Sequence, residues 1–239
     1  MDSPLPSEST GPGPVADILW AAAITAVLVL ITGAKLGLGP VFYTASILLF
    51  SVMAGLVLGY WPARTDFGWA NRATLLRGCL VVVLISLAPF AAHLGNGLWL
   101  YGIACLVALI LDGVDGAIAR RTDSQTAFGA RFDMELDAVF ILGLCVAVLA
   151  LGKAGVWVLA LGLMRYGFVL ASLALPFMNR PLPESLRRKT VCVWQVVTLM
   201  IAVLPVASTS FASWTLATAL ILLSYSFLAD LYWLYQRRN

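Results

Sequence analysis

Residues 111–137 read LDGVDGAIARRTDSQTAFGARFDMELD, and this stretch joins two long apolar segments. Asp112 and Asp115 stand three residues apart near the end of the first segment, whereas Asp133 and Asp137 stand four apart at the start of the second. On a helix, either spacing places both side chains on one face. If the segments are antiparallel neighbours, the short polar link between them brings all four carboxylates together. The stretch therefore predicts two adjacent helices that share an acidic site.

The composition is that of a membrane protein. Of the 239 residues, 61% are hydrophobic and 11% are charged, against about 25% charged residues in soluble domains. A helix needs about 20 apolar residues to cross a bilayer, and eight segments have this length. We therefore predict an all-α, polytopic membrane helix bundle with spans near residues 16–34, 41–61, 73–94, 97–119, 132–152, 154–178, 190–208 and 211–235.

The positions of the basic residues predict an orientation, because Lys and Arg gather in cytoplasmic loops. With both termini in the cytoplasm, Lys35 and Lys153 face outward and Arg165 lies within a span. The other twelve Lys and Arg residues then lie on the cytoplasmic side with the acidic site: Arg64, Arg72, Arg77, Arg120, Arg121, Arg131, Arg180, Arg187, Arg188, Lys189, Arg237 and Arg238. We expect an integral protein of the inner (cytoplasmic) membrane. The net charge of +3 is small, and nucleic acid is not expected as a partner.

The clustered aspartates indicate a metal site, because an ionised side chain at membrane depth costs several kcal/mol unless it is paired, hydrated or metal-bound. Ligation by carboxylate oxygens suits Mg²⁺, Mn²⁺ or Ca²⁺, and Mg²⁺ normally completes its shell with waters and substrate phosphates. A diphosphate is thus the natural ligand. Two alternatives remain at this point. The acids could be solvated helix ends paired with nearby arginines, or they could line the path of a divalent-cation transporter.

The same residues resemble the signature of the CDP-alcohol phosphotransferase family. That signature reads Asp-x-x-Asp-Gly-x-x-Ala-Arg, eight residues, Gly, three residues, Asp, three residues, Asp. Every fixed position is matched here with both long spacings intact, by Asp112, Asp115, Gly116, Ala119, Arg120, Gly129, Asp133 and Asp137. The resemblance implies an enzyme that transfers a substituted phosphate group from a CDP-activated substrate.

The resemblance covers roughly residues 68–235 and implies a six-helix catalytic core. The predicted organisation is then a flexible tail over 1–15, two extra transmembrane helices over 16–62, and the core over 63–239. The two added helices carry no buried acid, and a role in packing, in covering a dimer interface or in binding a partner stays open. Trp61, Trp69, Trp99 and Trp233 near predicted span ends suit interfacial anchors, with simple filling of apolar surface as the alternative.

The resemblance also implies how the donor's diphosphate is bound. Asp112, Asp115, Asp133 and Asp137 are expected to hold two Mg²⁺ or Mn²⁺ ions, and Asp137 is also the expected base for the acceptor hydroxyl. The Asn-x-x-Thr-x-x-Arg segment, which in relatives lies along the membrane surface, is expected to help hold the nucleotide. The expected CDP-binding residues are Asn71, Thr74, Arg77, Asp112, Gly116, Ala119, Arg120 and Gly129.

The acceptor is expected to meet basic side chains, because guanidinium and ammonium groups bind phosphate well. Candidates are Arg165 within the sixth span and Arg187, Arg188 and Lys189 before the seventh. These last three could instead contact anionic lipid. Asp230 lies close enough to the cytoplasmic end to be solvated. CDP-diacylglycerol is the expected donor, with glycerol 3-phosphate or inositol phosphate as acceptor, in a membrane-embedded protein that could be a homodimer. The alternative is CDP-choline or CDP-ethanolamine with diacylglycerol.

Overall fold

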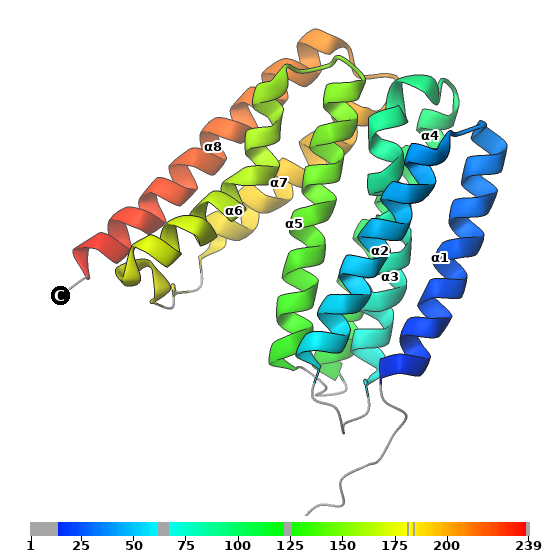
Figure 1. Cartoon of the computed structure of the whole chain (residues 1–239). Helices are drawn as coiled ribbons and strands as arrows, with labels where there is room; N and C mark the ends of the chain where they lie inside the picture. The colour runs from blue at the N-terminus through cyan, green and yellow to red at the C-terminus, as the bar shows by residue number, and fades with distance from the viewer. Residues whose placement is uncertain (1–13, 62–66, 122–125, 181, 184, 238–239) are drawn as a thin grey trace, which may run out of the picture. The chain divides into compact units, whose positions relative to one another are not determined.

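The computed structural model describes residues 14–61, 67–121, 126–180, 182–183 and 185–237, without the side chains of 115–121, 176 and 179. Within these residues the chain forms eight α-helices and no strand, which confirms the all-α prediction (Figure 1). Three short 3₁₀ helices join them. The α-helices are α1 (Pro14–Leu36), α2 (Pro40–Tyr60), α3 (Trp69–Leu87), α4 (Gly97–Arg121), α5 (Ala127–Ala150), α6 (Leu159–Ala174), α7 (Leu186–Val203) and α8 (Thr209–Gln236).

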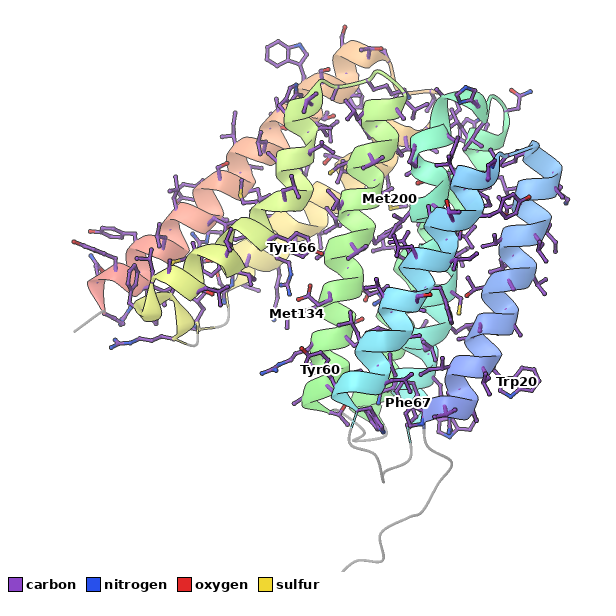
Figure 2. The ribbon with its side chains drawn as sticks, in the orientation of Figure 1. Trp20, Tyr60, Phe67, Met134, Tyr166 and Met200 are labelled. Atoms are coloured by element: carbon purple, nitrogen blue, oxygen red, sulfur yellow. The ribbon has the colours of Figure 1, made fainter. Side chains whose placement is uncertain are left out.

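Six of these helices are long and apolar enough to cross a membrane. They are α1, α2, α3 with the 3₁₀ helix Ala88–His93, α4, α6 with the 3₁₀ helix Val156–Val158, and α8. Large apolar side chains face outward from them, and Trp20, 73% exposed, points away from the neighbouring helices (Figure 2). The other two helices, α5 and α7, carry charged residues in their first half. The charges of α5 include Asp133 and Asp137, two of the predicted site residues.

Contacts divide the chain into two units, of which the first comprises residues 1–86 and 104–136. In this unit α1 and α2 form a hairpin. Gly37 ends α1 with a φ of 60°, a left-handed conformation that glycine adopts without strain. The Leu38 N–H then reaches back to the Gly33 carbonyl at 3.0 Å, as in a Schellman cap. Pro40 opens α2, where its missing N–H is tolerated.

The core of the first unit shows that the hairpin packs directly on the helices that carry the signature. Ile18 and Ala21 of α1 and Met53 and Val57 of α2 join one buried cluster with Trp61 and Phe67, which lie between α2 and α3, and with residues of α3 and α5: Leu75, Cys79, Val82 and Phe132. Trp61 is 8% exposed and lies with its ring edge-on to Phe67 and Phe128. The prediction that Trp61 is an interfacial anchor is therefore wrong, because the aromatic rings around it exclude it from the surface.

The second unit comprises residues 87–103 and 137–239. Here α7 packs along α8, and α6 contacts α8. The buried faces of α7 and α8 include small side chains, such as Ala202, Ala212 and Ala219, which allow two membrane helices to approach closely. The Gln195 side chain on α7 donates to the Leu161 carbonyl at 2.9 Å and ties α7 to α6.

Several boundaries differ from the expectation, among them the start of α5 at Ala127, five residues earlier, and that of α6 at Leu159, five residues later. α3 begins at Trp69 and α7 at Leu186, each about four residues earlier than the apolar segments suggest. Polar residues continue both helices because nothing in these stretches breaks the backbone hydrogen bonding. As a result Asn71, Thr74 and Arg77 belong to the first half of α3. They lie on one continuous helix rather than on a separate surface segment.

Candidate active site

The acidic site is built on two helix ends. Asp112 lies near the end of α4, and Asp133 and Asp137 lie one turn apart near the start of α5. One carboxylate oxygen of each of the three lies within 4.8 Å of the others, and all three residues are half-buried. The predicted convergence of the two helix ends is therefore observed. Asp115 follows Asp112 by one turn of α4, and its side chain lies outside the described residues.

The donor set fits a divalent cation. Opposite ligands of one octahedral Mg²⁺ lie about 4.2 Å apart, given metal–oxygen distances of about 2.1 Å, so the three oxygens are near ligand spacing. The side chains of Asp112 and Asp133 are 30% and 37% exposed, which leaves them open to a ligand. Carboxylates are hard oxygen donors of the kind that Mg²⁺ and Mn²⁺ prefer.

Arg77 supplies a fixed positive charge beneath these acids. Its side chain, 3% exposed, reaches from α3 and donates one guanidinium N–H to Asp112 and another to Asp133. The bidentate shape of guanidinium suits this bridging, whereas an ammonium group is a single point charge. Arg77 thereby links α3 to the ends of α4 and α5. Its predicted contact with the nucleotide stays a prediction, and its contact with the carboxylates is an additional finding.

Asn71 connects the α3 segment to the glycine of the signature. The Asn71 side chain is buried, and its Nδ2 donates to the Phe67 carbonyl at 2.6 Å. A Cβ added at Gly129 would overlap Asn71 Oδ1 and lie 3.0 Å from Thr126 Oγ1. Thr126 is the N-cap of α5, because its Oγ1 accepts the Gly129 N–H at 2.9 Å. Gly129 is thus required by the close approach of α3 to the first turn of α5.

The remaining residues predicted to bind CDP lie on α4 and α3. Gly116, Ala119 and Arg120 lie in the last turns of α4, where only the backbone is described. Thr74 is buried on α3, and its hydroxyl donates to the Ala70 carbonyl at 3.1 Å. Asn71, Thr74 and Arg77 follow each other at intervals of three residues, which places them along one side of α3.

The basic residues predicted for the acceptor lie in the second unit. Arg187 and Arg188, in the first turn of α7, both donate to Asp230 of α8, and Arg188 does so at 3.4 Å. Asp230 is 8% exposed, so the expectation that it is solvated is wrong. Its burial is stabilised by the two arginines, whose long side chains reach across from α7. With Pro183 and Trp233 these residues line a cavity of about 260 Å³.

The other two acceptor candidates differ in exposure. Arg165 is half-buried in α6, whereas Lys189 is exposed on α7. The sequence reasoning misjudged the surroundings of Asp230 and Trp61, which are both buried. The apolar residues around them conceal their contacts, and no local spacing connects Asp230 with Arg187, which lies 43 residues away in the sequence.

Comparison with known proteins agrees with the geometry. A stretch of 83 residues is 39% identical to Ethanolaminephosphotransferase 1 of Homo sapiens, and it covers 33% of this chain and 21% of that protein. The corresponding proteins of Pongo abelii and Mus musculus are 39% and 37% identical over the same shares. The chain thus matches only about a fifth of the length of these relatives. No solved structure matches it. The family model described as CDP-alcohol phosphatidyltransferase matches residues 67–225, which include Arg77 and all four aspartates, and the chain therefore belongs to the CDP-alcohol phosphatidyltransferase family.

Proposed function

We propose that this protein transfers a substituted phosphate group from a CDP-alcohol to a hydroxyl group of a second substrate, with release of CMP. The observation that carries the proposal is the convergence of Asp112, Asp133 and Asp137 at the ends of α4 and α5, inside the segment that the family model matches. A divalent-cation transporter would need acids along a path through the membrane, whereas these gather at one point. Family membership also favours the transferase.

The proposed reaction breaks one phosphoanhydride bond. The acceptor oxygen attacks the phosphorus that carries the donor's alcohol, the bond from that phosphorus to the bridging oxygen breaks, and CMP leaves with the bridging oxygen. Asp137 accepts the proton of the acceptor hydroxyl. Asp112, Asp115, Asp133 and Asp137 would hold two divalent cations, which when bound offset the diphosphate's negative charge and polarise its phosphoryl oxygens.

Arg77 prepares the site for this reaction. Its guanidinium group holds the Asp112 and Asp133 carboxylates at one place, although like charges repel. Arg120, Gly116 and Ala119, one to two turns beyond Asp112, are the proposed contacts of the CDP moiety, together with Asn71, Thr74 and Gly129. The donor therefore approaches α3 and the last turns of α4, and the acceptor hydroxyl approaches Asp137 on α5.

Two arrangements of the lipid are candidates. In the first, CDP-diacylglycerol is the donor and a phosphorylated alcohol is the acceptor. The basic residues Arg165, Arg187, Arg188 and Lys189 support it, because guanidinium and ammonium groups bind phosphate well. In the second, a CDP-aminoalcohol is the donor and diacylglycerol is the acceptor. The likeness to proteins named Ethanolaminephosphotransferase 1 supports this arrangement.

The deciding experiment measures CMP release by the purified protein with Mg²⁺ or Mn²⁺. One series pairs CDP-diacylglycerol with glycerol 3-phosphate, inositol phosphate, inositol, serine or phosphatidylglycerol. A second series pairs CDP-ethanolamine or CDP-choline with diacylglycerol. We expect release in one series only, and its loss in EDTA. If neither series releases CMP above the protein-free control, the proposed function is wrong.

The role of Asp137 is tested by Asp137→Asn, compared with Glu135→Gln, which makes the same chemical change two residues away on α5. General-base catalysis contributes about a hundredfold or more, so Asp137→Asn should lower kcat at least that far. Glu135→Gln should stay within about twofold of the wild type. A near-normal kcat for Asp137→Asn would remove Asp137 from the mechanism.

A further inference from the structure

An ion pair connects the added N-terminal helix to the helix that carries the nucleotide segment. Asp17, in the first turn of α1, accepts a hydrogen bond from Arg72 Nε at 2.9 Å, and Arg72 lies in the first turn of α3. The two side chains are 18% and 25% exposed. Asp17 is half-buried, and its Oδ2 atom is enclosed. This acid lies outside residues 67–225, the segment that the family model matches.

Apolar packing brings α1 and α2 close to α3 around this pair. A Cβ added at Gly78 of α3 would lie 2.6 Å from Met53 Sδ of α2. On the α1 side, Cys79 Sγ lies 3.5 Å from the Ala21 carbonyl oxygen. Apolar contacts are non-directional. They hold the helices together, but they restrain the rotation of α3 about its axis only weakly. A directional ion pair supplies that missing restraint.

The pair lies at the same end of the first unit as the acidic site. α1 and α3 both begin at this end (Figure 1). Arg72 precedes Arg77 by five residues, which is about 7.5 Å along the helix axis. Arg72 also lies with its Cζ 5.4 Å from the centroid of the Trp69 ring, so an aromatic face and a carboxylate both restrain its guanidinium group.

The restraint on Arg72 acts on its neighbour Asn71. Successive side chains on an α-helix point about 100° apart, so Arg72 faces α1 while Asn71 faces the first turn of α5. Asn71 lies against Gly129 with no room for a methyl group between them. A small rotation of α3 would move Asn71 away from Gly129 and would change how Arg77 meets Asp112 and Asp133.

From this geometry we infer that Asp17 is a positioning residue of the active site. Through Arg72 it sets the rotation of α3, and hence the places of Asn71 and Arg77. The two added helices are thus a working part of the catalytic unit. This inference rests on the proposed function for its kinetic consequence, whereas the structural consequence, a less ordered start of α3, holds whatever the substrate.

The test compares three variants with the wild type: Asp17→Asn, Asp17→Glu, and a double variant in which the charges are exchanged, Asp17→Arg together with Arg72→Asp. Lys35→Gln, a charge removal at the exposed far end of α1, is the control. We expect Asp17→Asn to raise the KM for the CDP donor about five- to tenfold with kcat within about twofold, since the proposed base Asp137 lies on α5 and not on the helix that Asp17 restrains. Asp17→Glu and the charge exchange should recover most of the wild-type KM.

Hydrogen exchange provides a readout that does not depend on activity. Amides of residues 69–77 should exchange faster in Asp17→Asn than in the wild type, and at the wild-type rate in Lys35→Gln. Unchanged exchange with unchanged KM would overturn the inference. So would a lowered melting temperature with unchanged KM, because that describes a merely structural contact. If the wild type releases no CMP while exchange still responds to Asp17→Asn, the proposed function fails and the positioning of α3 by Asp17 stands.

Discussion

Arg77 and its two acids determine the charge balance of the site before any cation binds. The side chain is 3% exposed and pairs with both Asp112 and Asp133. Removing one partner of a fully buried ion pair typically destabilises a protein by about 3–5 kcal/mol, and the cost here is smaller because Asp112 and Asp133 are 30% and 37% exposed to screening solvent. A divalent cation can replace part of that missing charge. The stability of the site should therefore depend on metal more strongly when Arg77 is absent.

A prediction follows for the variant Arg77→Gln. Its melting temperature in EDTA should fall clearly below that of the wild type, and Mn²⁺ or Mg²⁺ should raise it by more than in the wild type. Lys35→Gln, which removes an exposed cation, should behave as the wild type does. Thermal unfolding in detergent with and without metal measures both effects. Equal metal-induced shifts in the two proteins would contradict the account.

The role of Gly129 is steric. Its replacement by alanine would press a methyl group onto Asn71 Oδ1 and Thr126 Oγ1. Overpacking of this kind costs about 1–3 kcal/mol, and displacement of Asn71 should also weaken donor binding. We expect Gly129→Ala to lower both the melting temperature and CMP release. Gly55→Ala in α2, where the added Cβ meets no atom within 4 Å, should lower neither.

At the scale of elements, close packing of α5 and α6 depends on one glycine in the second unit. A Cβ at Gly162 would lie 2.8 Å from Leu142 Cα, which is backbone and cannot move aside cheaply. Gly162→Ala should therefore destabilise the protein by about 1–3 kcal/mol. Gly167→Ala, one and a half turns further along α6, meets open space and should be neutral or stabilising. Chemical or thermal unfolding of the two variants distinguishes them.

The turn after α5 contains a lysine that caps another helix. Lys153 is 9% exposed, and its Nζ donates to the carbonyl of Leu204, just after α7, at 2.5 Å. Burial lowers the pKa of Lys153 below its usual 10.5. The folded protein therefore binds fewer protons than the unfolded chain between this lowered pKa and about 10.4. Stability from this group must rise with pH across that window.

The resulting prediction compares the wild type with Lys153→Met. As the pH rises from the lowered pKa of Lys153 towards 10.5, the melting temperature of the wild type should rise relative to that of the variant, and below the lowered pKa the difference should be constant. Tryptophan fluorescence during heating can follow both proteins. A difference that decreases with rising pH would show that the charged form of Lys153 is favoured by folding, against the expectation.

At the scale of the whole molecule, the orientation in the membrane stays a prediction from the basic residues. It places position 124 inside the cell and position 155 outside. Single cysteines at these two positions can be labelled with an impermeant thiol reagent in intact cells. Cys192→Ser should serve as the background, since Cys192 is exposed while Cys79, Cys105 and Cys145 are buried. Labelling at 124 without permeabilisation would reverse the proposed topology.

The main elements of this protein are predictable from sequence because their signals are local. A run of about 20 apolar residues must satisfy its own backbone hydrogen bonds in lipid, and a helix does so. The spacings of Asp112 and Asp115 and of Asp133 and Asp137 place each pair on one helix face without reference to any other part of the chain. The eight helices and the acidic site at the ends of α4 and α5 followed from these signals.

The pairings between distant residues were decided by the tertiary structure alone. Asp17 and Arg72 are separated by 55 residues, and Arg187 and Asp230 by 43. Whether such acids are solvated or paired depends on which helices pack together and how each is rotated, and an apolar sequence leaves that rotation almost free. For this protein the sequence determined which helices form and which acids cluster. Only the packing of those helices decided that Arg77 bridges the acids, that Asp17 holds Arg72, and that Trp61 is buried.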